Sequence, residues 1–158
     1  MSLAELPLLT PDLPGTGGQI KVEPEHFVVA EVPLYEPAGE GDHLFVCVTR
    51  SGRTTQQVVG DLAAELKVAP RDIGYAGLKD RQARATQVLS LPYITSDQAQ
   101  TAADAVGLEL HWAIPHNKKL KMGHLLGNRF TITVLDPSAE NPVGCARDVV
   151  AALQRRGL

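Results

Sequence analysis

Alternating apolar and polar residues, and runs of β-branched and aromatic residues, predict a set of short strands along the chain. The clearest is HLFVCVT at residues 43–49, which the turn pair Ser51-Gly52 ends. The first apolar stretch is expected to form two strand pieces, broken at Glu23-Pro24-Glu25. The predicted strand segments are residues 20–34, 43–49, 73–76, 87–91, 108–114 and 129–135.

Apolar residues spaced three and four apart predict three helices. They run from Thr54 or Thr55 to before Pro70, from Ser96 to Val106, and from Asn141 or Pro142 towards Gly157. Strands and helices in this order, with hairpin-length connections, favour an α+β domain that has a mainly antiparallel sheet with packed helices. The glycine-rich run GTGG at residues 15–18 lacks the remaining residues of a dinucleotide fingerprint or a P-loop, which argues against both.

Length and composition favour a single domain. The 158 residues, 44% of them hydrophobic, suffice for one core. Residues 1–18 are rich in proline and glycine and predict an irregular lead-in, so the domain is assigned to residues 19–158. No apolar run approaches the ~20 residues that cross a bilayer, and we expect a cytoplasmic protein with no membrane partner. Cys47 and Cys145 lack the spacing of metal ligands, and no metal is expected.

The charge is unevenly distributed along the chain. The net charge is -3, but residues 1–70 carry four basic and ten acidic residues, a balance of -6, and residues 71–158 carry eleven and eight, a balance of +3. Residues 116–130 hold no carboxylate at all. The cations of the second half gather in two groups, Lys79, Arg81 and Arg84, and Lys118, Lys119, Lys121 and Arg129. They could line one face that binds an anionic ligand, or they could lie in two solvated loops.

A polar loop in the second half could carry chemistry. In GYAGLKDRQARATQ, residues 74–87, Asp80 lies between cations, which lower the pKa of a carboxylate and keep it ionised. An ionised, positioned carboxylate can act as a nucleophile or a base. The alternative is a surface turn in which Asp80 pairs with Arg81 or caps a backbone amide.

Three motifs in order carry a family resemblance. They are IKVEPEHFVVAE at residues 20–31, GYAGLKDRQARATQ at residues 74–87 and NKKLKMGHLLGNRF at residues 117–130. Together they resemble the successive N-terminal motifs of the TruD family of tRNA pseudouridine synthases, over about residues 19–135 and without the lead-in and the final helix. The resemblance implies a pseudouridine synthase-like catalytic domain.

The resemblance also implies a reaction and its residues. Such enzymes isomerise uridine to its C-glycoside, in this family uridine 13 in the D-arm of tRNA, without cofactor or metal. Asp80 would be the nucleophile, attacking C1′ of the ribose or C6 of the base, and Lys21 would be the basic residue that pairs with it. Phe130 would stack on the target uracil and Phe27 would flank it. Asn128 would order the loop around Asp80.

The reaction makes physical demands that these residues could meet. The target base must leave the RNA stack, and an aromatic surface such as Phe130 replaces the lost stacking. The carboxylate must be ionised yet shielded from water, which calls for a buried cationic partner such as Lys21. The cations expected to hold tRNA phosphates are Lys79, Arg81, Arg84, Lys118, Lys119, Lys121 and Arg129.

Each of these roles has a structural alternative. Phe130 could be a core residue of its strand, Lys21 an ordinary edge-strand charge, and Asn128 half of a turn pair with Gly127. Family members are longer, so the chain is expected to be an N-terminal portion whose incomplete sheet edge favours self-association. Two other functions stay open: a non-catalytic RNA-binding module, and a metal-dependent nuclease that uses Asp80 and Asp72.

Overall fold

The computed structural model describes residues 8–157, which form two compact units. The larger unit comprises residues 21–133, and residues 8–20 with 134–157 form the smaller one. The strands are β1 (Phe27–Pro33), β2 (His43–Ser51), β3 (Gly74–Tyr75), β4 (Arg84–Pro92), β5 (Glu109–His116) and β6 (Leu125–Ile132). The helices are α1 (Thr55–Leu66), α2 (Ser96–Ala105) and α3 (Pro142–Arg155), with short 3-10 turns at Pro24–His26 and Pro70–Asp72.

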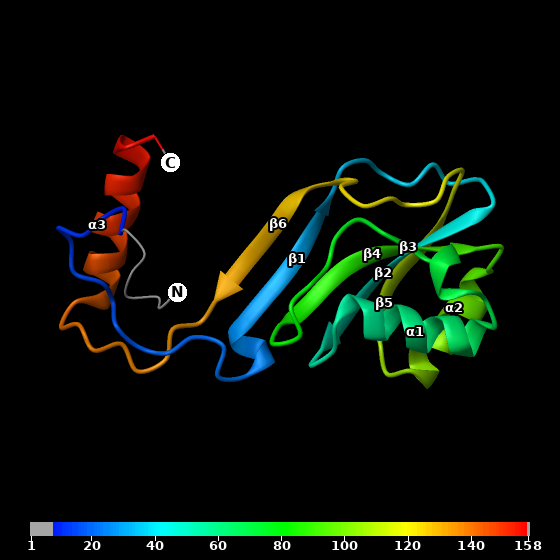
Figure 1. Cartoon of the computed structure of the whole chain (residues 1–158), viewed down its shortest axis with the longest axis horizontal. Coiled ribbons are helices and arrows are strands. Elements are labelled where there is room, and N and C mark those ends of the chain that lie inside the picture. Colours follow the sequence, from blue (N-terminus) through cyan, green and yellow to red (C-terminus); the bar gives the residue numbers. More distant parts are fainter. Residues whose placement is uncertain (1–7, 158) are drawn as a thin grey trace. The chain divides into compact units, whose positions relative to one another are not determined.

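One mixed sheet organises the larger unit (Figure 1). The strand order is β5-β2-β4-β1-β6, and β3 adds to β4. Only β1 and β4 run parallel among the described pairs, over Val28–Ala30 and Arg84–Thr86. The predicted α+β class with a mainly antiparallel sheet is therefore confirmed.

Helices α1 and α2 supply the main core together with strands β2 and β4. Thr54 caps α1 and Thr95 caps α2, each by accepting a backbone N–H of the first turn, which satisfies donors that the helix leaves free. Their apolar faces bury the core residues Leu44, Val46, Val48, Val58, Val59, Leu62, Leu89, Leu91, Ala99 and Ala102. None of the helices in the described part of the chain is long and apolar enough to cross a membrane.

Two strands begin at least three residues before the predicted start, because pairing with distant strands extends both. Strand β4 begins at Arg84 rather than at residue 87, where its first residues pair with β1 and β2. Strand β6 begins at Leu125 rather than at residue 129, because it runs antiparallel to the whole of β1. Gly127 and Asn128 therefore lie in a strand, and the alternative of a turn pair is wrong.

The first predicted strand piece is also wrong. Ile20 and Val22 lie outside any strand, and Gln19 forms an isolated bridge with Leu135. In the smaller unit, the Asn141 side chain accepts the Gly144 N–H and caps α3, as the sequence predicted. The lead-in is irregular where the structure describes it, from residue 8 to residue 18; residues 1–7 lie outside the described part.

Candidate active site

The Lys21 ammonium and the Asp80 carboxylate form an ion pair, although 59 positions separate them in sequence. The distance from Nζ to Oδ2 is 2.5 Å. The backbone N–H of Gln82 donates to the other carboxylate oxygen at 3.0 Å. The hydrogen bond from Lys21, and after it the one from Gln82, lower the pKa of Asp80 below its usual value. Asp80 is therefore ionised at neutral pH, with Lys21 rather than Arg81 as its partner.

Two aromatic rings continue the site from this ion pair. Lys21 has φ +59°, in the left-handed region, and its Nζ lies 4.1 Å from the centroid of the Phe27 ring. The Phe27 and Phe130 centroids are 5.8 Å apart. Phe130 lies opposite Val29 in the pairing of β1 with β6, and 54% of it is exposed. The structure thus brings Asp80, Lys21, Phe27 and Phe130 together, and Phe130 is not a core residue.

The ion pair itself is open to solvent. The Lys21 side chain is 29% exposed and the Asp80 side chain 43%. The expectation of a buried, water-shielded pair is therefore wrong for this chain. The physical reason is that Lys21 precedes strand β1 and Asp80 lies in the loop between β3 and β4, so neither residue is part of a strand.

Lys79, the neighbour of Asp80, is buried, which contradicts its expected contact with RNA phosphates. Its Nζ lies 2.6 Å from Oε2 of Glu31, and the two side chains are 2% and 1% exposed. The other oxygen of Glu31 accepts the N–H of Val88 at 3.3 Å. The Glu31 side chain thus accepts a backbone N–H of β4 beyond Thr86, where the pairing of β4 with β1 ends.

Hydrogen bonds also hold the backbone of Lys79. Its N–H donates to Oγ1 of Thr55 at 2.9 Å, and its carbonyl accepts from Nη2 of Arg50 at 3.3 Å. The Thr55 hydroxyl also accepts from Arg50 and donates to Gln87, so one hydrogen-bonded cluster joins β2, α1 and β4. Burial, and after it the charge of Arg53, lower the pKa of Arg50 to about 10. Lys79, the residue next to Asp80, is therefore held through its backbone N–H, its carbonyl and its side chain.

Sequence reasoning missed most of this cluster. Glu31 ends the first motif and could have been suspected from that position. Arg50 and Thr55 lie in no motif, and the local pattern marks Thr55 only as a candidate helix start. Their role depends on contacts between segments that are far apart in the chain.

The other predicted cations differ in their surroundings. Arg81 donates to the carbonyl of Gly52 at 3.2 Å, and Arg84 pairs with Glu109 at 2.6 Å on the surface. Arg129 lies opposite Ala30 in the strand pairing, so it projects to the other face of the sheet from Phe130. The predicted cations Lys118, Lys119 and Lys121 lie in the segment between β5 and β6.

Asn128 shares a sheet face with Phe130. It lies opposite Glu31 and is exposed, two positions from Phe130 along β6. Its predicted part in ordering the loop around Asp80 stays a prediction.

Comparison with known proteins identifies the family. The family model for tRNA pseudouridine synthase D (TruD) matches residues 4–158. The chain belongs to the TruD family. The match to the TruD model includes the final helix and most of the lead-in, so the expectation that the resemblance leaves them out is wrong.

Individual TruD relatives agree with this assignment. The tRNA pseudouridine synthase D of Thermus thermophilus is 43% identical over 152 residues, which cover 96% of this chain and 42% of the relative. That of Geotalea daltonii is 40% identical over 152 residues, 96% of this chain and 38% of the relative. The crystal structure of the putative tRNA pseudouridine synthase D from Methanosarcina mazei has a TM-score of 0.88 at 28% identity, covering 96% of this chain and 35% of that one. This chain thus spans about two fifths of the length of these curated relatives.

Proposed function

We propose that this chain carries the reacting residues of a tRNA pseudouridine synthase that isomerises uridine 13 in the D-arm of tRNA, without cofactor or metal. One observation supports this most strongly: Asp80 is held ionised by Lys21, at 2.5 Å, and Lys21 contacts Phe27, which in turn contacts the exposed ring of Phe130. Such a set offers a nucleophile and a surface for a flipped base on one side of a sheet.

Each residue of the set has a proposed task. Asp80 attacks either C1′ of the ribose or C6 of the base, and Lys21 keeps its carboxylate deprotonated. Phe130 stacks on the uracil once the base has left the RNA stack, and Phe27 supports both Lys21 and Phe130. The ion pair is open to solvent in this chain, and bound RNA is proposed to displace water from it.

The exposed cations are proposed to bind RNA phosphates. Arg81, Lys118 and Lys121 are exposed, and Arg84 can exchange its surface carboxylate partner for a phosphate. Lys119 and Arg129 are further candidates, whereas Lys79 is not, since it is buried. Contacts of this kind supply salt-dependent affinity without sequence choice.

Other functions remain as outcomes of the test. A non-catalytic RNA-binding module would bind RNA with a steep salt dependence and leave uridine unchanged. A metal-dependent nuclease using Asp80 and Asp72 would need a divalent cation, but no group of three or more His, Cys, Asp or Glu side chains within residues 8–157 is arranged to hold one. The cytoplasmic location and the self-association at the sheet edge stay predictions.

The deciding experiment maps pseudouridine in tRNA. Residues 1–158 replace the matched segment of the Thermus thermophilus relative, and this chimera is tested beside the 158-residue chain alone. We expect pseudouridine at position 13 with the chimera, its loss in Asp80→Asn, and its retention in the control Asp72→Asn. RNA binding without isomerisation by the wild-type chimera would favour the binding module instead.

A further inference from the structure

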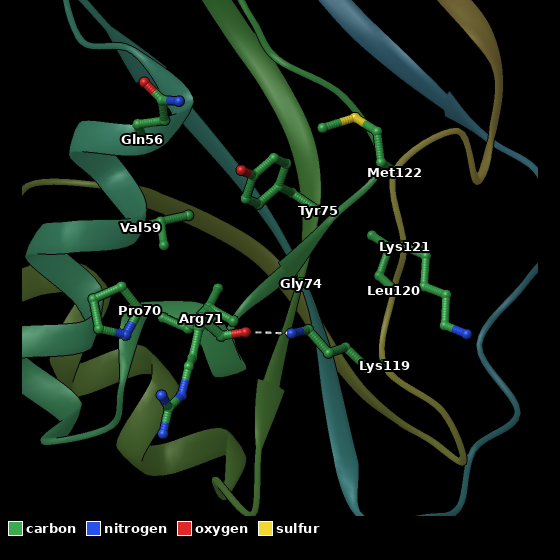
Figure 2. A pocket seen from close by; sticks show the side chains of 11 residues that line it. Gln56, Val59, Pro70, Arg71, Gly74, Tyr75, Lys119, Leu120, Lys121 and Met122 are labelled. Carbon is green, nitrogen blue, oxygen red and sulfur yellow. Dashed lines mark hydrogen bonds between the residues drawn. The ribbon is translucent and has the colours of Figure 1, made fainter.

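A pocket lies beside the loop that carries Asp80. This pocket of about 580 Å³ is formed by α1, the turn at residues 70–72, strand β3 and the segment 119–122 (Figure 2). Its volume is within the range of small-ligand sites. Of its lining residues, only Lys119 and Lys121 have a role in the proposals above, as candidate phosphate contacts.

Close backbone contacts fix one side of the pocket. A Cβ on Gly74 would lie 2.3 Å from the carbonyl oxygen of Leu120, so the first glycine of the GYAGLKD motif allows the two segments to touch. The N–H of Leu120 donates to Oγ of Ser90 at 3.0 Å, and the N–H of Gly123 donates to the carbonyl of Ala76 at 2.8 Å. These contacts hold the segment 119–123 against the strand that leads to Asp80.

The lining combines an apolar wall with cations. The apolar side consists of Val59, Pro70, Tyr75 and Met122, and Met122 is 59% exposed although it is a large apolar residue. The cations are Arg71, Lys119 and Lys121, and no carboxylate residue is among the lining residues.

Two of the three cations, Arg71 and Lys119, are in contact with each other. Lys119 reaches across to the carbonyl of Arg71 and keeps two further N–H donors, whereas the Lys121 side chain points away from the other lining residues (Figure 2). Within residues 8–157, neither Arg71 nor Lys119 forms an ion pair with a carboxylate. Their charge is therefore free for an anionic ligand.

We infer that this pocket binds a second ribonucleotide of the RNA whose uridine lies at Asp80, with its base against Tyr75 and Met122 and its phosphate at Lys119 and Arg71. This inference rests on the proposed function. An aromatic or apolar surface for a base and cations for its phosphate are the usual elements of single-stranded RNA binding.

The position of the pocket suits that ligand. Tyr75 lies five residues before Asp80 on the same strand-to-loop segment. Gln56 in the lining follows Thr55, whose hydroxyl holds the backbone of Lys79. One RNA strand that passes over this loop can therefore meet both sites.

Binding of the 158-residue chain to a fluorescent RNA hairpin across a salt series tests the inference. The double variant Arg71→Gln/Lys119→Gln should weaken binding and flatten the slope of log K against log salt by roughly 0.7 for each phosphate that the variant no longer neutralises. The control Arg147→Gln/Arg155→Gln removes the same charge from exposed positions of α3 and should change neither quantity comparably. Equal effects of the two variants would overturn the inference.

A second measurement does not depend on charge or on catalysis. In NMR titration with uridine 5′-monophosphate, the amides of Tyr75 and Met122 should shift, and Met122→Gln should weaken that binding without threatening the fold, because Met122 is exposed. An absence of shifts at these amides with both the mononucleotide and the RNA hairpin would overturn the inference. Shifts with the hairpin alone would support it and would show that the site needs the RNA strand.

The two proposals can fail separately. If Asp80→Asn abolishes pseudouridine formation while the pocket variants bind RNA as the wild type does, the pocket inference is wrong and the function stands. If the nucleotide binds the pocket but Asp80→Asn still isomerises uridine, the assignment of Asp80 as the reacting residue is wrong and the pocket stands. If the wild-type chimera forms no pseudouridine while the nucleotide binds the pocket, the proposed function is wrong and the pocket stands.

Discussion

Removing the ammonium of Lys79 should destabilise the chain strongly, although a lysine in a charged loop would ordinarily tolerate substitution. Lys79→Met keeps the length of the side chain and removes its charge. Glu31 then stays in place with a side chain only 1% exposed and without its cation. A buried charge without a partner is one of the few causes of large destabilisation by a single substitution.

The expected size follows from this burial. Breaking a buried ion pair by removing one partner costs about 3–5 kcal/mol of unfolding free energy. For a chain of this length, that lowers the melting temperature by roughly 6–20 °C. The exposed control Lys121→Met should stay within about 0.5 kcal/mol of the wild type.

Urea unfolding followed by circular dichroism measures both variants. The double variant Lys79→Met/Glu31→Gln removes the orphaned charge and keeps an oxygen that can accept the N–H of Val88, so it should recover most of the stability that Lys79→Met removes. A loss in Lys79→Met no larger than that in Lys121→Met would refute the reasoning. So would a double variant no more stable than Lys79→Met.

Three further predictions concern the candidate site and its surroundings. Lys21→Ala should raise the pKa of Asp80 towards its ordinary value, so that on acidification activity is lost at a higher pH, while the share of stability that the wild type loses as Asp80 is protonated disappears. Carboxyl NMR titration measures the pKa, and an unchanged pKa would contradict the assigned cause. Phe130→Leu should weaken RNA binding about tenfold, because it removes the stacking ring, with little loss of stability, because the ring is exposed. Phe130→Tyr is the control that keeps stacking, and equal RNA binding by the two variants would contradict the stacking role. Burial, and after it the charge of Glu31, raise the pKa of Cys47 to about 11, so roughly one thiol in a thousand is ionised at pH 8. Alkylation of Cys47, followed by mass spectrometry, should therefore be slow, and rapid labelling of the folded chain would contradict this prediction.

Local sequence patterns predicted two helix caps and the position of one strand. Thr54 and Asn141 cap helices as predicted, and the run at residues 43–49 lies within β2. The starts of β4 and β6 could not be predicted in the same way. Pairing with β1 and β2 determines the start of β4, and pairing with β1 determines that of β6. The turn-like pair Gly127-Asn128 thus lies in β6 because it pairs with a strand about a hundred residues earlier in the sequence.

The candidate site was likewise predicted from sequence only in part. The three motifs led to Asp80, Lys21, Phe27 and Phe130, and the structure brings these residues together. The burial of Lys79 could not be read from its surroundings in sequence, since its partner Glu31 lies 48 positions earlier. The sequence of a charged loop predicts solvated side chains, and only the tertiary structure shows that Lys79 is buried against the Glu31 carboxylate.

The central claim is that Asp80, held ionised by Lys21, reacts with uridine in RNA. The most direct test is the single-turnover rate of pseudouridine formation by the chimera carrying residues 1–158, measured beside its dissociation constant for tRNA. Asp80→Asn should lower this rate by at least about a thousandfold and change the dissociation constant little, because the substitution removes the nucleophile and keeps the shape of the side chain. A rate within tenfold of the wild type would contradict the claim.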